Sequence, residues 1–211
     1  MRENILFIAA HSDDHIFGAG GTIAKYAEEG KQVHVIVLSY GEKTHPWLKA
    51  HITKAFRADE TFKADAIVGC TSRFFDLKEG SFATGYPTIQ NEMLRIVKAS
   101  KPAKIFTHNN EDPHPDHRAA YTITRDIIKK AKIKPELYIF SIWNPFSVRK
   151  SHHPRMYVDI TASHTKKMKA IKRFKSQWAA LSILIGGIIA RDIKNGLHIG
   201  TKFAEQFYRV L

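Results

Sequence analysis

The sequence predicts an α/β fold with three layers, in which a mostly parallel central sheet is flanked by helices on both faces. Apolar runs of strand length recur along the chain, and segments with apolar residues at three- and four-residue spacing separate them. This alternation is typical of parallel strands joined by crossover helices. The expected strands cover residues 5–10, 33–38, 66–68, 104–107, 137–142 and 156–160. The expected helices cover residues 18–29, 50–62, 88–100, 118–132 and 163–180.

The chain length favours one domain over residues 1–211, because 211 residues with 44% hydrophobic content can bury roughly 70% of their unfolded surface. Cys70 is the only cysteine, which excludes an intramolecular disulfide and leaves His, Asp and Glu as metal ligands. The first apolar run has six residues, too few for a signal peptide, so a cytoplasmic location is expected.

The net charge of +13 indicates an acidic partner, either a phosphate-bearing small molecule, an anionic membrane surface or nucleic acid. Lys/Arg clusters at residues 129–134 and 166–175 have little aromatic interleaving, which disfavours nucleic acid, and solvated helix faces also explain them. The longest apolar stretch, residues 178–190, has thirteen residues against the ~20 that cross a bilayer, so no transmembrane segment is expected. We expect this stretch in the chain's own core; a homo-oligomer contact and a pocket wall are the alternatives.

Two segments rich in histidine and aspartate each follow a predicted strand. HSDDH occupies residues 11–15, and THNNEDPHPDH occupies residues 107–117. Open α/β sheets bind ligands outside the carboxyl ends of their strands, so both segments are expected at one rim. Adjacent carboxylates repel each other unless a cation offsets their charge, and His and Asp ligation without cysteine suits a zinc ion (Zn²⁺).

Two other interpretations apply to the first segment. Ser and Asp at a strand end also act as helix N-caps, so HSDDH indicates a metal only in combination with the second segment. The glycines Gly18, Gly20 and Gly21 suggest dinucleotide binding, but GxGxxG spacing requires glycine where Ile23 stands. Two carboxylates would also oppose a pyrophosphate, so we expect these glycines to permit close backbone approach instead.

The motifs resemble those of the LmbE-like, or PIG-L, zinc-dependent deacetylases, whose hallmarks are AHPDDE after the first strand and HPDH further on. The corresponding segments here read AHSDDH at residues 10–15 and HPDH at residues 114–117. Further similar segments are FGAGGTIA at 17–24, RADE at 57–60, KAIKRFKSQ at 169–177 and AEQF at 204–207. The resemblance therefore spans nearly the whole chain and implies a Rossmann-like deacetylase domain.

The resemblance implies zinc held by His11, Asp14 and His117, with Asp13 as the general base that activates water. It also implies that His114 faces the substrate carbonyl and that Asp116 orients the His114 imidazole. Amide hydrolysis needs a nucleophile near neutral pH, a stabilised oxyanion and a proton for the leaving amine, and these residues can supply all three. Both Asp13 and His114 remain candidates for the acid.

The chain departs from the family pattern at three positions. Ser12 replaces the family's proline, and Phe174 stands where histidine is expected before SQ. His15 replaces the family's glutamate, and we expect it to lie behind the ligands, in contact with Arg57 or, alternatively, on the metal itself. Arg57 is also the expected substrate-binding residue, with Lys43 and Arg118 near the same rim.

The family acts mainly on N-acetylglucosamine groups, so the resemblance implies removal of an N-acetyl group from a small amino-sugar substrate. The positive charge suits an anionic or lipid carrier on that sugar. An amidase acting on another N-acyl substrate is the nearest alternative. A metal-dependent phosphoesterase is less favoured, because two-metal phosphate sites need about six or more ligands. A catalytically inactive binding module is opposed by the intact Asp13 and HPDH.

Overall fold

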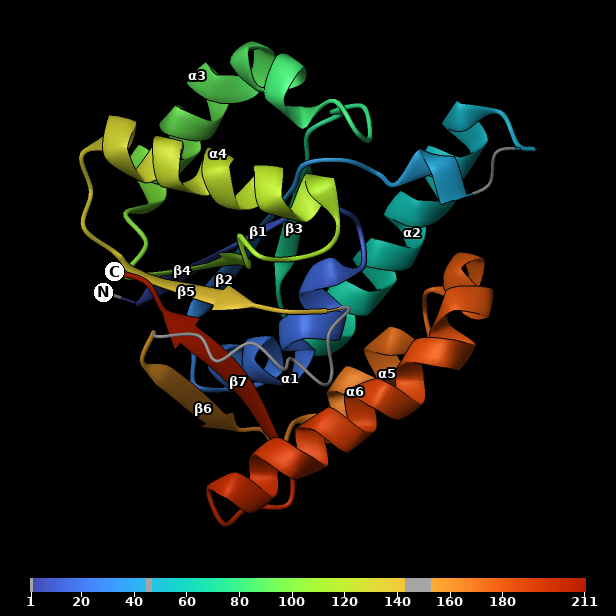
Figure 1. The fold of residues 1–211 in the computed structure, drawn as a ribbon, viewed down its shortest axis with the longest axis vertical. Coiled ribbons are helices and arrows are strands. Elements are labelled where there is room, and N and C mark those ends of the chain that lie inside the picture. Colours follow the sequence, from blue (N-terminus) through green and yellow to red (C-terminus); the bar gives the residue numbers. More distant parts are fainter. Residues whose placement is uncertain (1, 45–46, 143–152) are drawn as a thin grey trace.

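The computed structural model describes residues 2–44, 47–142 and 153–211, and its strands form one sheet in the order β3-β2-β1-β4-β5-β7-β6 (Figure 1). The strands are β1 (Asn4–Ala9), β2 (Gln32–Val37), β3 (Thr71–Phe74), β4 (Lys104–His108), β5 (Glu136–Phe140), β6 (Arg155–Asp159) and β7 (Ala204–Arg209). The helices are α1 (Asp14–Glu28), α2 (Ala50–Val68), α3 (Phe82–Ser100), α4 (Pro115–Ala131), α5 (His164–Ile171) and α6 (Trp178–His198), with short 3-10 turns η1 (Glu42–Thr44) and η2 (Lys175–Gln177).

The sheet is mostly parallel, as the sequence predicts. β1 pairs in parallel with β2 and β4, and these extend in parallel to β3 and β5. Only β7 runs antiparallel among the described strands, pairing with both β5 and β6. The chain order reverses between β1 and β4, and the carboxyl ends of strands at such a switch point are where α/β sheets bind ligands. The two histidine-rich segments follow these two strands.

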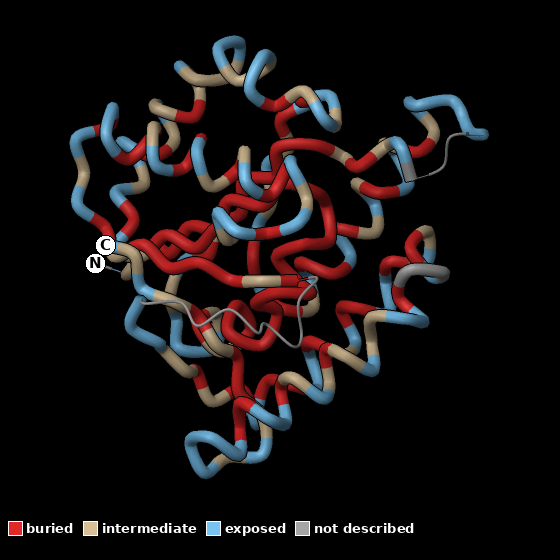
Figure 2. Tube along the Cα trace, viewed as in Figure 1, coloured by how far each residue is buried: buried red, intermediate tan, exposed pale blue. Residues whose placement is uncertain are grey.

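Helices cover both faces of the sheet (Figure 1). In β1, Ile5, Phe7 and Ala9 pack in a core shared with α1, α2, α5 and α6. The alternate residues Leu6 and Ile8 pack in a second core with α3 and α4. Because both faces of the strand are buried, its sequence is continuously apolar, which is typical of a sheet between two helical layers (Figure 2).

Several predicted elements are wrong in extent or type. Residues 66–68, predicted as a strand, form the last turn of α2, which ends where Gly69 adopts a left-handed φ of 81°. The next strand is β3, and β7 was not predicted. The predicted helix at residues 163–180 divides into α5, η2 and the start of α6. Short apolar runs do not distinguish a strand from a buried helical turn, which explains the first error.

The predicted burial of residues 178–190 holds only for one side of α6. Leu181 and Ile188 are buried, whereas Trp178 and Ile183 are 67% and 82% exposed. Among the described residues, no helix has the length and apolar character needed to cross a bilayer.

The close packing of α1 against neighbouring residues requires glycine at two of its positions. A Cβ on Gly18 would lie 2.5 Å from the Phe140 ring, and one on Gly21 would lie 2.7 Å from Ile160. These glycines therefore let α1 approach the residues on and beside β5 and β6, which matches the expected close approach.

Candidate metal centre

The ligand-type residues come from the carboxyl ends of β1 and β4. His11 and Asp13 lie in the turn after β1, and Asp14 is the first residue of α1. His114 is the N-cap of α4, and His117 lies in its first turn, after Pro115 at the start of the helix. Each motif thus turns directly from a buried strand into a helix, which holds its side chains at the switch point.

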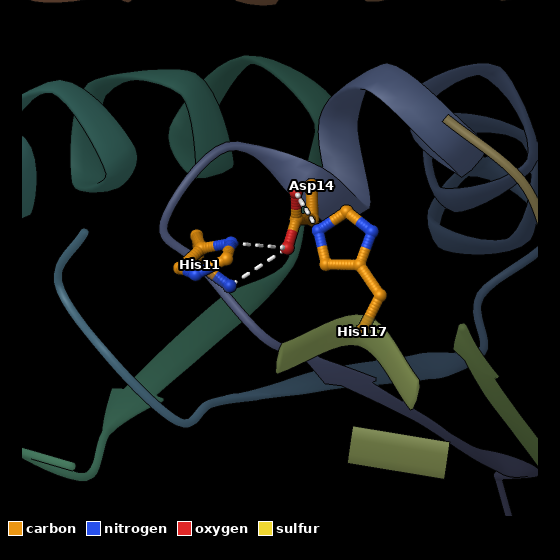
Figure 3. Close-up of side chains that lie close together, drawn as sticks. All are labelled: His11, Asp14 and His117. Carbon is orange, nitrogen blue, oxygen red and sulfur yellow. Dashed lines mark hydrogen bonds and ion pairs between the residues drawn. The ribbon is translucent and has the colours of Figure 1, made fainter. Parts of the chain in front are cut away.

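The three predicted metal ligands lie together. His11, Asp14 and His117 each offer a ligand atom within 4.8 Å of the other two (Figure 3). Asp14 Oδ2 accepts a hydrogen bond from the His11 backbone N–H at 2.7 Å and lies 3.4 Å from His11 Nδ1. Asp14 Oδ1 lies 3.5 Å from His117 Nε2. All three side chains are buried, so a cation between them would be well shielded from water.

His117 is held from behind by Asp112, a residue that the sequence analysis missed. Asp112 Oδ1 lies 3.0 Å from His117 Nδ1. Nε2 of His117 is buried and has no hydrogen-bond partner in the described part of the chain, while it faces Asp14. A carboxylate beside one ring nitrogen and no hydrogen-bond partner on the other is the arrangement of a metal-ligating histidine once the second nitrogen loses its proton. The signal for Asp112 was present, because it stands in the same acidic loop as HPDH.

His108 forms the floor of the centre and was also missed. Its ring stacks on His117 with centroids 4.0 Å apart, and its Nε2 accepts the Ala10 N–H at 3.0 Å and lies 3.2 Å from Asp14 Oδ2. Burial, together with the charge of His117, lowers the pKa of His108 to about 4. His108 is therefore neutral at physiological pH, and it supports His117 by ring stacking and the end of β1 by accepting the Ala10 N–H.

The charges of the centre are strongly coupled. Burial alone lowers the pKa of His11, but hydrogen bonds to Asp116 and Asp14 raise it to about 10. Burial also opposes charge on His117, yet the charge of Asp14 and the Asp112 contact raise its pKa to about 9. Burial raises the pKa of Asp14, but His117 and His108 hold it well below its usual range. Without a metal, protons on the imidazoles thus offset the buried carboxylates, a role that a cation can take over.

Asp13 lies beside these ligands and is paired with Arg57. The Arg57 Nη2 atom is 3.3 Å from Asp13 Oδ2, and Arg57 Nε donates to Ser12 Oγ at 2.8 Å. Ser12 therefore anchors the arginine with its hydroxyl group, which the family's proline would lack. Asp13 and Arg57 line a cavity of about 240 Å³ together with His11, Asp14 and His114.

His114 and Asp116 meet through the backbone. The Asp116 N–H donates to His114 Nδ1 at 3.2 Å, whereas the Asp116 carboxylate accepts the Gly80 N–H at 2.9 and 3.0 Å. Asp116 Oδ2 also lies 3.3 Å from His11 Nε2. The backbone amide of Asp116 therefore contacts the His114 ring, which is compatible with the predicted role of Asp116 in orienting His114. The Asp116 carboxylate contacts His11 instead. His11, His114 and Asp116 form a second group of ligand-type atoms within 4.8 Å that shares His11 with the first.

His15 has a different partner from the expected Arg57. Its Nε2 lies 2.9 Å from Asp65 Oδ1 on α2, and the Cys70 thiol donates to the same oxygen at 3.3 Å. All three residues are buried. His15 therefore ties the first turn of α1 to α2 and belongs to a separate group from the His11 cluster.

The other predicted rim residues have structural contacts. Arg118 Nη1 donates to the backbone oxygens of Asp112 and Pro113 at 2.7 and 2.8 Å. Lys43 Nζ donates to the Glu79 oxygen at 2.8 Å. Phe17, Ile142 and Leu184 make the apolar wall of the 240 Å³ cavity. A larger cleft of about 350 Å³ lies between α6 and strands β6 and β7, but its lining contains none of the His11 cluster.

The sequence profile of the PIG-L family, described as GlcNAc-PI de-N-acetylase, matches residues 6–128, which include β1, β4 and both halves of the metal centre. The chain belongs to this family, as the motif resemblance predicts.

Relatives with sequences similar to this chain carry names of different activities. A 4-oxalmesaconate hydratase from Pseudomonas putida is 29% identical over 83% of this chain and 74% of its own length. A 1D-myo-inositol 2-acetamido-2-deoxy-alpha-D-glucopyranoside deacetylase from Actinosynnema mirum is 28% identical over 64% of the chain and 58% of its own length. A diacetylchitobiose deacetylase from Thermococcus kodakarensis is 24% identical over 83% of the chain and 70% of its own length.

Solved structures share the whole fold. The crystal structure of the 4-carboxy-2-hydroxymuconate hydratase from Pseudomonas putida superimposes with a TM-score of 0.86 at 24% identity, covering 99% of this chain and 96% of that one. The N,N'-diacetylchitobiose deacetylase from Pyrococcus horikoshii has a TM-score of 0.82 at 20% identity, covering 99% and 84%. The fold of this chain is therefore that of the family throughout.

Proposed function

We propose that this protein is a zinc-dependent hydrolase that removes the N-acetyl group from an N-acetylglucosamine-type amino sugar. The observation that carries the proposal is the buried His11–Asp14–His117 cluster with Asp13 beside it in one cavity. Relatives named as deacetylases of acetamido sugars support the substrate class.

The cluster fits a zinc ion by its donor set and by the buried, unpartnered Nε2 of His117. His11, Asp14 and His117 would hold the ion, with Asp112 and His108 supporting them. Zinc bound there would supply a Lewis acid that polarises a carbonyl group and lowers the pKa of water to about 7.

Asp13 is the proposed base. Its carboxylate lies on the cavity wall, where it can accept a proton from the attacking water and pass that proton to the leaving amine. The Arg57 guanidinium, 3.3 Å away, fixes the orientation of the carboxylate before substrate arrives.

His114 is the proposed carbonyl-binding group. Its Nδ1 accepts the Asp116 N–H, so the neutral ring carries its hydrogen on Nε2. Since His114 lines the cavity, that N–H is available to donate to the carbonyl oxygen as negative charge develops there. Burial and the charges of His11 and His117 lower the pKa of His114, which favours this neutral form.

A hydratase acting on an unsaturated, carboxylated substrate is the second candidate. The relative named 4-oxalmesaconate hydratase matches a larger share of this chain than the Actinosynnema mirum deacetylase does. Hydration also needs activated water and a positioned acid and base, which the same residues can supply. Arg57 on the cavity wall offers a guanidinium for a substrate carboxylate, although Asp13 already contacts it.

An amidase acting on another N-acyl substrate uses the same chemistry and differs only in what the cavity holds. A phosphoesterase is less favoured, because the groups of ligand-type atoms at this site overlap: the His11–His114–Asp116 group shares His11 with the proposed zinc ligands, and the His108–Asp112–His117 group shares His117 with them. An anionic or lipid carrier on the sugar, which the positive charge suits, and a cytoplasmic location are part of the proposal.

The test combines metal analysis with product assays. Purified protein loaded with zinc is offered a panel of N-acetylated sugars, with acetate release measured, and 4-oxalmesaconate, with loss of its ultraviolet absorbance measured. We expect acetate release and one zinc per chain. Hydration without acetate release would assign the second candidate and overturn the first.

Asp13→Asn tests the base. The substitution should retain zinc and lower the rate of acetate release by about 10²- to 10⁴-fold, because it removes proton transfer without removing a ligand. Asp76→Asn, which alters an exposed carboxylate paired with Lys54, is the matched control and should leave the rate unchanged. Full activity in Asp13→Asn would exclude Asp13 as the base, and loss of zinc would make it a ligand.

A further inference from the structure

Helix α6 presents an apolar stripe to solvent. The α6 stripe consists of Ile183, Gly186, Ala190, Ile193 and Leu197, which are exposed and follow one another at the three- and four-residue spacing of a single helix face. Ile183 and Leu197 are 82% and 76% exposed. Figures 1 and 2 show α6 on the outside of its helical layer, with exposed segments along its outer side.

The inner side of the same helix is already buried by the chain. Leu181 and Ile188 pack into the core, and Asp192 is buried beside Lys167. A surface helix normally carries polar residues on its outer face, whereas the α6 stripe contains no charged or polar side chain. An apolar face of this length on a monomer marks an interaction surface.

The spacing of the α6 stripe is self-complementary. Ile183 stands seven residues before Ala190, and Leu197 stands seven residues after it. If a second α6 crosses antiparallel at Ala190, each Ile183 meets the Leu197 of the other copy. Ile193, three residues after Ala190, then faces Gly187, three residues before it. Large residues thus oppose large ones at the ends, and a large residue opposes a small one near the centre, as interdigitated helix packing requires.

Small residues at the crossing permit close approach of two helices. A Cβ added to Gly186 would meet no atom within 4 Å, so this part of the surface is open. The antiparallel arrangement also sets the two helix dipoles in opposite directions. Lys194, four residues after Ala190, lies opposite Gly186 of the other copy, and its flexible stem can extend past that small residue to solvent.

We propose that α6 binds α6 of a second copy of this chain, in an antiparallel two-fold dimer centred on Ala190. The contact is isologous, so the same stripe serves both copies and closes the assembly at two. A helix of 21 residues is ~31 Å long, so a contact made by one stripe of this helix is small compared with the ~1,600 Å² of a standard specific interface. We therefore expect a dissociation constant in the micromolar range.

The dimer would also reach the candidate active site. Leu184 lines the 240 Å³ cavity and is the neighbour of Ile183 in the chain. The Leu197 of the second copy would pack on Ile183, next to that wall.

A cysteine at the crossing point tests the register. Ala190→Cys places two thiols face to face across the two-fold axis, within reach of a disulfide, while Cys70 stays buried. We expect nearly complete disulfide-linked dimer on mild oxidation of the full chain. Ala99→Cys, at an alanine on α3 that is also exposed, is the control and should stay monomeric on a non-reducing gel. Absence of the Ala190→Cys crosslink would overturn the antiparallel register.

A charge on the stripe tests the interface. Sedimentation of the wild-type chain from 1 to 200 µM should show a monomer–dimer equilibrium, and Ile183→Lys should weaken it by about 100-fold, because each dimer loses two apolar contacts. Thr122→Lys adds the same charge on α4 and should not change the equilibrium. The proposal would be overturned if the wild-type chain stayed monomeric over this range. That holds also if the monomer bound anionic vesicles through the α6 stripe.

Discussion

Replacement of Lys167 should strongly destabilise the protein, because this residue forms ion pairs with two buried carboxylates. Its Nζ lies 2.6 Å from Asp192 Oδ2 and 2.7 Å from Glu205 Oε1, and all three side chains are 0–1% exposed. Glu205 also accepts the backbone N–H groups of Gly21 and Thr22 at 3.0 and 2.7 Å. The ammonium group thereby joins α5, α6 and β7 to the middle of α1, the helix that begins with Asp14.

The expected magnitude follows from the burial of the network. Lys167→Met retains the aliphatic stem but removes the cation nearest to both carboxylates, which leaves Asp192 with only Arg191, 4.0 Å away, among the described lysines and arginines, and breaking a buried ion pair in this way costs about 3–5 kcal/mol. For a chain of 211 residues this corresponds to a fall in Tm of about 6–20 °C. The neighbouring Lys166 provides the control, because its pair with Glu28 is 2.7 Å long but about half exposed, so Lys166→Met should cost less than about 1 kcal/mol.

Urea denaturation followed by circular dichroism measures both variants. A Lys167→Met stability within about 1 kcal/mol of the wild-type value would refute the reasoning, provided that Lys166→Met behaves as the control. Adding Asp192→Asn to Lys167→Met should restore part of the loss, since it removes one of the two buried carboxylates that lost the lysine.

Two further predictions concern the candidate site and its surroundings. His15→Glu should destabilise the fold by about 2–4 kcal/mol in urea, because it places a carboxylate against Asp65 in the core, and His15→Glu combined with Asp65→His should recover part of that loss. If the combined variant is no more stable than His15→Glu, the pairing of His15 with Asp65 is contradicted. Zinc affinity should rise with pH up to about 10, because zinc must displace protons from His11 and His117. Neighbouring carboxylates raise the pKa values of these residues, despite burial, to about 10 and about 9. Competition titrations against a chelator between pH 6 and 8 measure this slope, and an affinity independent of pH would refute it.

Local patterns were sufficient for the elements that carry the site. The apolar runs of β1 and β4 mark buried parallel strands, and polar loops that follow such strands meet at the switch point of the sheet. His11, Asp14 and His117 could therefore be predicted together although about a hundred residues separate them. The short run at residues 66–68 was misassigned because three apolar residues fit a helical turn as well as a strand.

The hydrogen-bond partners of the buried histidines could be identified only from the tertiary structure. Periodicity reports which side of an element is buried but not which residue lies opposite, so the pairing of His15 with Asp65 could not be predicted. For the same reason Asp112 appeared only as an acid in the loop, until the fold placed it 3.0 Å from His117.

By itself, the sequence determined the strand–loop–helix units and the chemistry of their loops, because these depend on residues close in the chain. Only the tertiary structure decided how β7 enters the sheet between β5 and β6, which acids support each histidine, and which side of α6 faces solvent. Those features depend on contacts between residues distant in the chain. Local sequence cannot tell whether an apolar helix face packs on the chain's own core or faces solvent. The outer stripe of α6 is the clearest example, since its composition favours burial and the fold leaves it exposed.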